Sequence, residues 1–267
     1  RIGTLSSRTR GFPTINIFPS FSMLNSRYLK QTGLFLKDCR LINTIRFTCV
    51  IPMEFKAEIT EIKTFVDNSV SLQPHTRIFK MKIPEDIKFE FKSGQFIMLA
   101  MEDFPLRGNP KMLKWSSYSV ASSQLEKSYL EFSIRLLETP GFTNHLKEKA
   151  HIGSKINIKG PFGVFTVKPD AKRLMYVCTG TGVAPLLSHI RTLLFSGSTI
   201  PISLFFGFKN PDVFIFREEL EELAKKYNNF KLEPTITDQG RGDWQGRNQI
   251  FHDFFPTYPF EGREETD

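Results

Sequence analysis

Two glycines flank a threonine in the segment Gly180-Thr181-Gly182-Val183-Ala184-Pro185. Glycines at this spacing let the backbone turn tightly and approach a phosphate without a Cβ in the way. A helix beginning here would add unpaired N–H groups and a partial positive charge, and Pro185 suits the first helical turn because its missing N–H costs nothing there. The segment predicts a nucleotide-phosphate loop; a plain tight turn stays open, because Pro185 replaces the last glycine of the full G-x-G-x-x-G pattern. The candidate contacts are Gly180, Thr181, Gly182, Ala184 and Pro185.

The elements around this loop alternate between strand and helix. Arg173–Cys178 is a continuous apolar run, typical of a buried parallel strand, and Ala184–Phe195 carries leucines at helical spacing. This order predicts a Rossmann-like, doubly wound parallel α/β domain over residues 170–267, with its ligand at the carboxyl ends of the strands. The further predicted elements are a strand at Ile202–Phe206, a charged helix at Phe216–Tyr227, a strand at Lys231–Thr237 and a helix at Gln249–Phe255.

Residues 53–169 show short strands separated by turns. Apolar and polar residues alternate from Phe55 to Val66, as in a half-buried strand. Clusters of Pro, Gly, Asp and Ser separate this strand from the others. Six such strands predict an antiparallel barrel or sandwich, with one short helix at Thr143–Lys149. The other strands are predicted at Thr76–Ile83, Gln95–Met101, Tyr118–Ala121, Tyr129–Leu136 and Lys155–Ile158.

The composition fits two modest globular domains, since the 267 residues are 40% hydrophobic. The net charge of +8 is concentrated in residues 1–52, where six arginines and two lysines face one acid. The remainder is almost neutral, which argues against a nucleic-acid groove. Three cysteines without metal-ligand spacing exclude an iron–sulfur cluster held by this chain alone, and we predict no metal site. The longest apolar runs are too short for a membrane span.

Residues 1–52 show no sustained helical or strand period. Their basic, hydroxylated and acid-poor composition is that of an organelle-targeting peptide. Two alternatives stay open: a segment that is not natural to the protein, because Met53 directly precedes the first patterned strand, or a structured extension. We predict a basic leader that is disordered or non-native. We place the protein in the cytoplasm, or in an organelle if the leader is a targeting peptide.

Six short motifs, in order, resemble those of the ferredoxin–NADP reductase-like flavoproteins, which include flavodoxin, ferredoxin and cytochrome b5 reductases. The resemblance covers about residues 54–267. The flavin signature Arg-x-Tyr-Ser-x-x-Ser is similar to the residues ending in Tyr118-Ser119-Val120-Ala121-Ser122. The other motifs are a flavin-pyrophosphate segment at 140–146, a barrel-closing turn at 160–165, the nicotinamide-nucleotide loop at 180–185, a strand and helix at 206–209 and 216–220, and a Trp-x-Gly turn at 243–246.

This resemblance implies that the barrel binds FAD and that the α/β domain binds NADH or NADPH. Hydride would pass from NAD(P)H to the flavin, and single electrons would then pass to a carrier such as ferredoxin, flavodoxin or a cytochrome. Ser119, near the reactive flavin nitrogen, and Thr181, between flavin and nicotinamide, are the catalytic candidates. Tyr118 would lay its ring on the flavin, unless it is a core aromatic, and Thr143 would bind the flavin phosphates, unless it is a plain N-cap. The remaining cofactor contacts implied are Ser116, Val120, Ile134, Arg135, Gly141, Phe142, Gly207, Lys209 and Asp238.

The sequence departs from the family pattern at two places. Ser116 stands where the signature arginine would pair with the flavin pyrophosphate, so FMN stays open beside FAD. Lys114 or Arg135 is a possible substitute, although lysine lacks the planar fork of arginine. The chain also stops at Asp267, where the family's last strand and its Cys-Gly-x-Pro segment would begin. We therefore expect a truncated nucleotide domain with an incomplete pocket.

The coenzyme and the role of the protein each leave alternatives. Asp238 would lie near the adenosine ribose, where an acid favours NADH, whereas Lys209 and Arg241 favour NADPH. We predict NADH, with a turn cap as the other role open to Asp238. The leading function is a flavin-dependent NAD(P)H oxidoreductase. The alternatives are an electron-transfer flavin subunit of a larger redox complex and a non-catalytic nucleotide-binding remnant.

Overall fold

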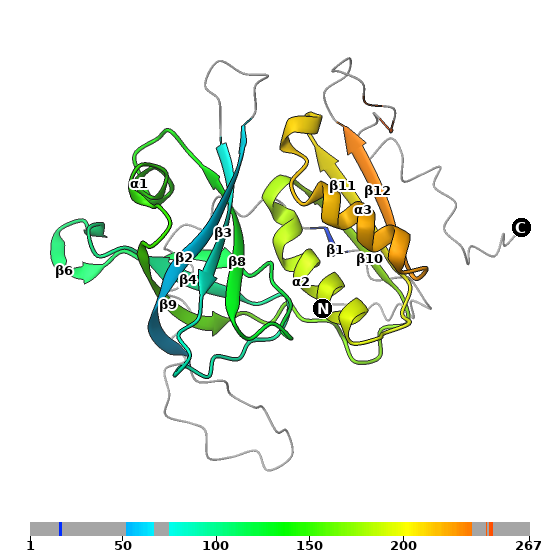
Figure 1. The fold of residues 1–267 in the computed structure, drawn as a ribbon, viewed down its shortest axis with the longest axis horizontal. Coiled ribbons are helices and arrows are strands. Elements are labelled where there is room, and N and C mark those ends of the chain that lie inside the picture. The colour runs from blue at the N-terminus through cyan, green and yellow to red at the C-terminus, as the bar shows by residue number, and fades with distance from the viewer. Residues whose placement is uncertain (1–15, 18–51, 67–74, 237–243, 245, 248–267) are drawn as a thin grey trace, which may run out of the picture.

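A computed structural model of the chain describes residues 16–17, 52–66, 75–236, 244 and 246–247. An antiparallel barrel and a parallel α/β unit lie side by side (Figure 1), and the barrel precedes most of the α/β unit in the chain. The predicted fold class, a six-stranded antiparallel barrel followed by a Rossmann-like α/β unit, is confirmed.

Six antiparallel strands form the barrel, in the order β7-β4-β9-β2-β3-β8. All six strands predicted from the sequence are present, although β7 begins and ends two residues early and β9 runs past its predicted end at Ile158. The strands are β2 (Met53–Val66), β3 (His75–Lys82), β4 (Phe96–Ala100), β7 (Ser116–Ser119), β8 (Tyr129–Leu136) and β9 (Lys155–Phe162).

The barrel core follows from the alternation of residues along its strands. In β8, Phe132 and Ile134 point into the core with Leu130 and Leu136, whereas Glu131 lies on the opposite face. Helix α1 (Phe142–Lys149), one residue longer than predicted, adds Phe142 and Leu146 to the same core.

The barrel is closed at one place by a backbone contact between β8 and the residues that follow β7. Just beyond β7, the N–H of Ala121 donates to the carbonyl of Glu131 in β8 at 2.7 Å. Within the described residues, no strand pairs with the outer edge of β7 or β8. A hairpin of β5 (Pro105–Leu106) and β6 (Asn109–Leu113) precedes β7, where the sequence predicted only a turn. Strands this short and proline-rich do not show a strand period.

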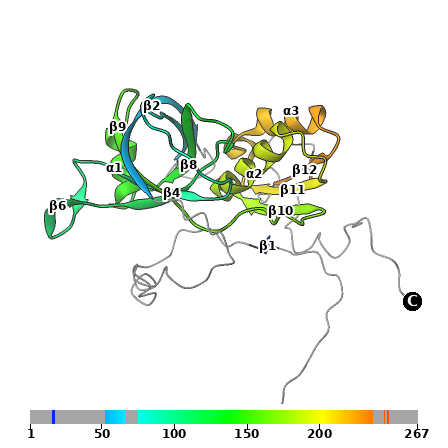
Figure 2. The same ribbon diagram turned by 90° about the horizontal axis from the view of Figure 1, so that it is seen from below.

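The α/β unit is a parallel sheet covered by two helices. Both helices lie on the same face of the sheet (Figure 2), because β10, β11 and β12 are neighbours in chain order and right-handed crossovers then place successive helices on one side. The described residues therefore do not show the doubly wound arrangement that the sequence predicted. The elements are β10 (Leu174–Thr179), a 3₁₀ turn (Gly180–Gly182), α2 (Val183–Phe195), β11 (Ile202–Phe208), a second 3₁₀ turn (Pro211–Val213), α3 (Arg217–Lys226) and β12 (Phe230–Ile236).

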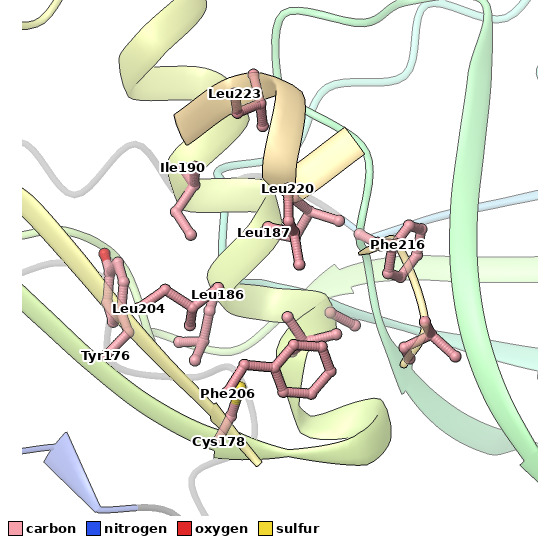
Figure 3. Close-up of a cluster of buried hydrophobic side chains, with 14 of the residues drawn as sticks. Tyr176, Cys178, Leu186, Leu187, Ile190, Leu204, Phe206, Phe216, Leu220 and Leu223 are labelled. Atoms are coloured by element: carbon pink, nitrogen blue, oxygen red, sulfur yellow. The ribbon is translucent and has the colours of Figure 1, made fainter. Parts of the chain in front are cut away.

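The core of this unit lies between the sheet and the two helices (Figure 3). Leu187 and Ile190 of α2 meet Leu220 of α3 above Leu204 and Phe206 of the sheet. All five side chains are fully buried, so apolar burial holds α2 and α3 on the sheet.

A short strand from the N-terminal segment lies beside β10. Strand β1 (Asn16–Ile17) pairs in parallel with Tyr176 and Val177. The sequence predicted no strand there, since two residues are too few to show a period. The predicted helix Gln249–Phe255 lies outside the described residues.

The barrel and the α/β unit share a tightly packed junction. Phe65 and Ile78 of the barrel strands pack into the core of the α/β unit. Gly94, with φ of 88°, lies against α2, so that a Cβ there would come within 1.8 Å of the Phe165 carbonyl oxygen and 2.3 Å of His189 Nε2. The junction leaves no room for a side chain at this position.

We expect Gly94→Ala to destabilise the protein more than Gly153→Ala does. Gly153 has a similar φ of 93° but nothing within 4 Å of an added Cβ, so it isolates the backbone strain. Overpacking should cost about 2 kcal/mol beyond that strain. Denaturant unfolding of both variants measures the difference, and equal losses of unfolding free energy would contradict this packing.

Candidate active site

The register of the parallel sheet brings several predicted site residues together at the carboxyl ends of its strands. Thr179 pairs with Gly207 of β11, and Gly207 pairs with Thr235 of β12. The turn Gly180–Gly182 follows Thr179, and Lys209 directly follows β11. These residues lie at the carboxyl ends of the strands, where parallel sheets bind their ligands. Asp238, the predicted ribose contact, lies outside the described residues.

The start of α2 is open to an anion. No side chain caps the helix, and its first turn holds no acid. Gly180 has φ of 50°, and nothing lies within 4 Å of a Cβ built on it. The turn Gly180–Gly182 leads into α2, and the Val183 N–H donates to carbonyls of this turn, so the N–H groups without a partner within the helix are those at the start of the turn. This geometry fits a phosphate, and the phosphate-binding role of the loop stays a prediction.

Strand β7 places Ser116, Tyr118 and Ser119 on an edge of the barrel. The ring centroid of Tyr118 lies 6.1 Å from that of Phe142 in α1. Burial raises the pKa of the Tyr118 hydroxyl above its usual range, and a hydrogen bond with Ser116 opposes that shift. Tyr118 is therefore a neutral phenol, packed between the barrel core and the edge.

Helix α1 also begins without a side-chain cap. Its N-cap is Gly141, no acid lies in its first turn, and Lys147 lies in its last. Thr143 is partly exposed in the first turn. His145, in the same turn, lies 2.9 Å from an oxygen of Asp103. The open N–H groups and the Thr143 hydroxyl fit a phosphate group, and their role as flavin-phosphate contacts stays a prediction.

Four predicted cofactor contacts have buried side chains. Val120 and Ile134 lie in the barrel core with Phe142, and Ala184 lies in the core of the α/β unit. These residues can reach a ligand only through backbone atoms, and the Val120 N–H already donates to the Gln95 carbonyl at 3.1 Å.

The two cations proposed to replace the signature arginine are placed differently. Arg135 is exposed, on the face of β8 opposite Ile134. The Lys114 ammonium lies 5.0 Å from the centroid of the Phe104 ring, which in turn stacks on His145 of α1 at 4.8 Å. Lys114 therefore lies on the side of the barrel where α1 begins.

Sequence reasoning missed a set of buried polar residues on α2. Ser188, His189, Arg191 and Thr192 are at most 9% exposed, and all of them contact the barrel. The sequence pattern of α2 could have predicted these buried polar residues. The helix is apolar on one side, and its polar residues lie close together instead of being spread over a solvated face.

No helix in the described part of the chain is long and apolar enough to cross a membrane. The same residues hold no group of three His, Cys, Asp or Glu side chains that could bind a metal ion.

Comparison with protein families matches each half of the chain to one domain type. Residues 63–167 match the oxidoreductase FAD-binding domain, and residues 176–259 match the oxidoreductase NAD-binding domain. The chain belongs to the ferredoxin–NADP reductase-like family of flavoproteins. This ferredoxin–NADP reductase-like chain thus carries an FAD-binding domain and an NAD-binding domain. The boundary we predicted between residues 169 and 170 falls between the two matches and stays a prediction.

Two curated members of the family show the extent of the similarity. Ferredoxin–NADP reductase B of Sorangium cellulosum is 29% identical over 177 residues, which are 66% of this chain and 69% of that protein. The reductase component of propane 2-monooxygenase of Mycolicibacterium smegmatis is 28% identical over 194 residues, 71% of this chain and 52% of that protein. The chain spans about half the length of the curated relatives that it matches first.

A solved family structure shows the same fold. The crystal structure of a ferredoxin NADP+ reductase from Neisseria gonorrhoeae with bound FAD and NADP has a TM-score of 0.56 and 23% identity, covering 76% of each chain. At this identity the likeness supports the fold alone.

We expect Gly182→Ala to weaken nucleotide binding without weakening the fold. Gly182 has φ of −62°, which any residue adopts, and the nearest atom to an added Cβ is the Cys178 Cβ at 3.8 Å. The free energy of unfolding should change by less than about 0.5 kcal/mol. A methyl group on the phosphate-facing loop should raise the Kd for NADH or NADPH about tenfold, measured by calorimetry. An unchanged Kd would identify the segment as a plain tight turn.

Proposed function

We propose that the chain is an NAD(P)H-dependent flavin oxidoreductase that supplies electrons to a one-electron carrier. The observation that supports this proposal is the position of the nucleotide turn at the junction of the two units. The turn Gly180–Gly182 of the NAD-binding domain lies beside β8, an edge strand of the FAD-binding barrel. A nucleotide on the turn and a flavin on the barrel edge would therefore meet at the same junction.

The residues of the chain would divide the work as follows. Gly180, Gly182 and the start of α2 hold the nucleotide phosphates, and Gly141 with Thr143 holds the phosphates of the flavin. Tyr118 would support the flavin ring, and Ser119 and Thr181 would contact the flavin and the nicotinamide. When bound, FAD accepts two electrons and one proton as hydride from NAD(P)H, leaves NAD(P)+, and can pass the electrons on singly. The protein positions the two rings and needs no side-chain base.

The electron acceptor belongs to this proposal too. We propose a ferredoxin, a flavodoxin or a cytochrome, because the family supplies carriers of this kind. The second candidate function is that of an electron-transfer subunit in a larger complex, favoured by the fact that the matched residues cover only about half the length of the relatives. We place the protein in the cytoplasm, or in an organelle if residues 1–52 form a targeting peptide.

We expect the purified chain to bind FAD and become yellow, and NADH to bleach this colour without oxygen. NADPH should act more slowly, since we propose that Asp238 favours the unphosphorylated ribose. The measurement is the visible spectrum during anaerobic titration with each nucleotide. A chain that stays colourless with added FAD or FMN, or that neither nucleotide bleaches, would overturn the proposed function.

We expect Ser116→Arg to strengthen FAD binding. The variant restores a guanidinium beside the proposed pyrophosphate site, and such charge-assisted bonds contribute about 1.5–3 kcal/mol, or at least about tenfold in Kd. Ser117→Arg is the matched control, because Ser117 is exposed and its side chain lies on the other face of β7. Fluorescence titration with FAD separates them. Equal tightening in both variants would show a general charge effect and contradict the assigned role of position 116.

A further inference from the structure

A polar strip on α2 docks this helix onto the barrel. Its four residues, Ser188, His189, Arg191 and Thr192, are 0%, 2%, 7% and 9% exposed. Buried polar groups cost free energy unless they are paired, and these are paired across the junction. The strip therefore adds directional contacts to the apolar packing at the junction.

Arg191 makes the widest set of contacts in the strip. Its Nη1 donates to the Ala121 carbonyl at 2.8 Å and to the carboxylate of Glu131 in β8. Its Nε and Nη2 donate to the two carboxylate oxygens of Glu219 in α3, each at 2.6 Å. One guanidinium thus joins α2, α3, the barrel strand β8 and the segment that follows β7.

The charges of this network depend on one another. Glu131 is 3% exposed, so its carboxylate would lie buried and unpaired without Arg191. Burial by itself lowers the pKa of Arg191, but the hydrogen bond to Glu219 and the charges of Glu131 and Glu219 outweigh it and raise that pKa. The Arg191 guanidinium is therefore charged at neutral pH.

Two other members of the strip, Ser188 and Thr192, bind the same part of the barrel. The Ser188 hydroxyl donates to the Ser122 carbonyl at 2.7 Å. The Thr192 hydroxyl lies 2.9 Å from that of Ser123 and accepts from the Gln124 N–H at 3.1 Å. Together with the Ala121 carbonyl, four consecutive residues of the barrel are held by α2.

These contacts between α2 and residues 121–124 connect the two halves of the proposed site. The segment 121–124 begins two residues after Ser119, and α2 begins at the turn Gly180–Gly182. Arg191 lies eight residues into the helix from Val183, about 12 Å along its axis at the usual rise per residue. A change in how α2 docks would therefore shift the nucleotide turn relative to the flavin edge.

We propose that Arg191, with Glu131 and Glu219, is a positioning residue for hydride transfer, which holds the nicotinamide turn in register with the flavin edge of the barrel. The inference rests on the proposed function. Reacting atoms must approach to about 3–3.5 Å, and a displacement of about 1 Å can slow a reaction about a hundredfold. A residue outside the site can thus limit the rate without touching either cofactor.

The test compares two ways of reducing the flavin in Arg191→Met. Anaerobic stopped flow measures the limiting rate with saturating NADH and, separately, the rate with dithionite, which needs no nucleotide domain. We expect the NADH rate to fall at least about tenfold, with an unchanged dithionite rate and a Kd for NADH within about twofold of wild type. Arg191→Lys keeps the charge but not the planar fork of the guanidinium. Its rate of reduction by NADH should therefore lie between those of the wild type and Arg191→Met.

Arg217→Met is the matched control. Its guanidinium bonds Glu221 within α3, and its side chain is 46% exposed. This variant should reduce at the wild-type rate with both reductants. If Arg191→Met fails to fold, Glu219→Gln replaces it, because the carboxylate of Glu219 is one-third exposed and Glu131 keeps its partner.

Each outcome decides one question. A folded, flavin-bound Arg191→Met or Glu219→Gln that NADH reduces at the wild-type rate would overturn the positioning role and leave the proposed function intact. An equal loss of both rates would mean general damage to the flavin site and would overturn the positioning role too. A wild-type chain that binds flavin but is not bleached by either nucleotide would instead overturn the proposed function.

Discussion

One buried cation, Arg191, lies between carboxylates from two different parts of the molecule. Glu131 belongs to the barrel and Glu219 to the helix that covers the parallel sheet. Removing one partner of such a network leaves an uncompensated buried charge, which costs about 3–5 kcal/mol. The docking of α2 depends on this balance, and both the nucleotide turn and the flavin edge depend on the docking of α2.

Most of the fold could be predicted because its elements have clear periods. The alternation along β8 and the apolar run of β10 identify one strand of each unit, and the leucines of α2 identify a helix. The hairpin β5–β6 and strand β1 were missed because they are short. The doubly wound arrangement expected from alternating strands and helices is not seen within the described residues, since strand order, and not alternation, decides which face a helix covers.

The site could be predicted only where the residue types themselves indicate a particular backbone conformation. Gly180 and Gly182 indicate a tight turn in any sequence, and the structure places that turn at the carboxyl edge of the sheet. The partners of Arg191 could not be predicted, because Glu131 and Glu219 are distant in the chain and resemble ordinary surface acids. Their burial depends on how two domains meet, which no local pattern records.

The most direct test of the junction is whether flavin and nicotinamide lie against each other on this chain. Adding NAD+ anaerobically to the reduced, flavin-loaded chain should produce a broad long-wavelength charge-transfer absorption, because two rings in contact share electron density. We predict this band for the wild-type chain. Its absence while calorimetry shows both cofactors bound would place them apart and contradict a shared site at the junction.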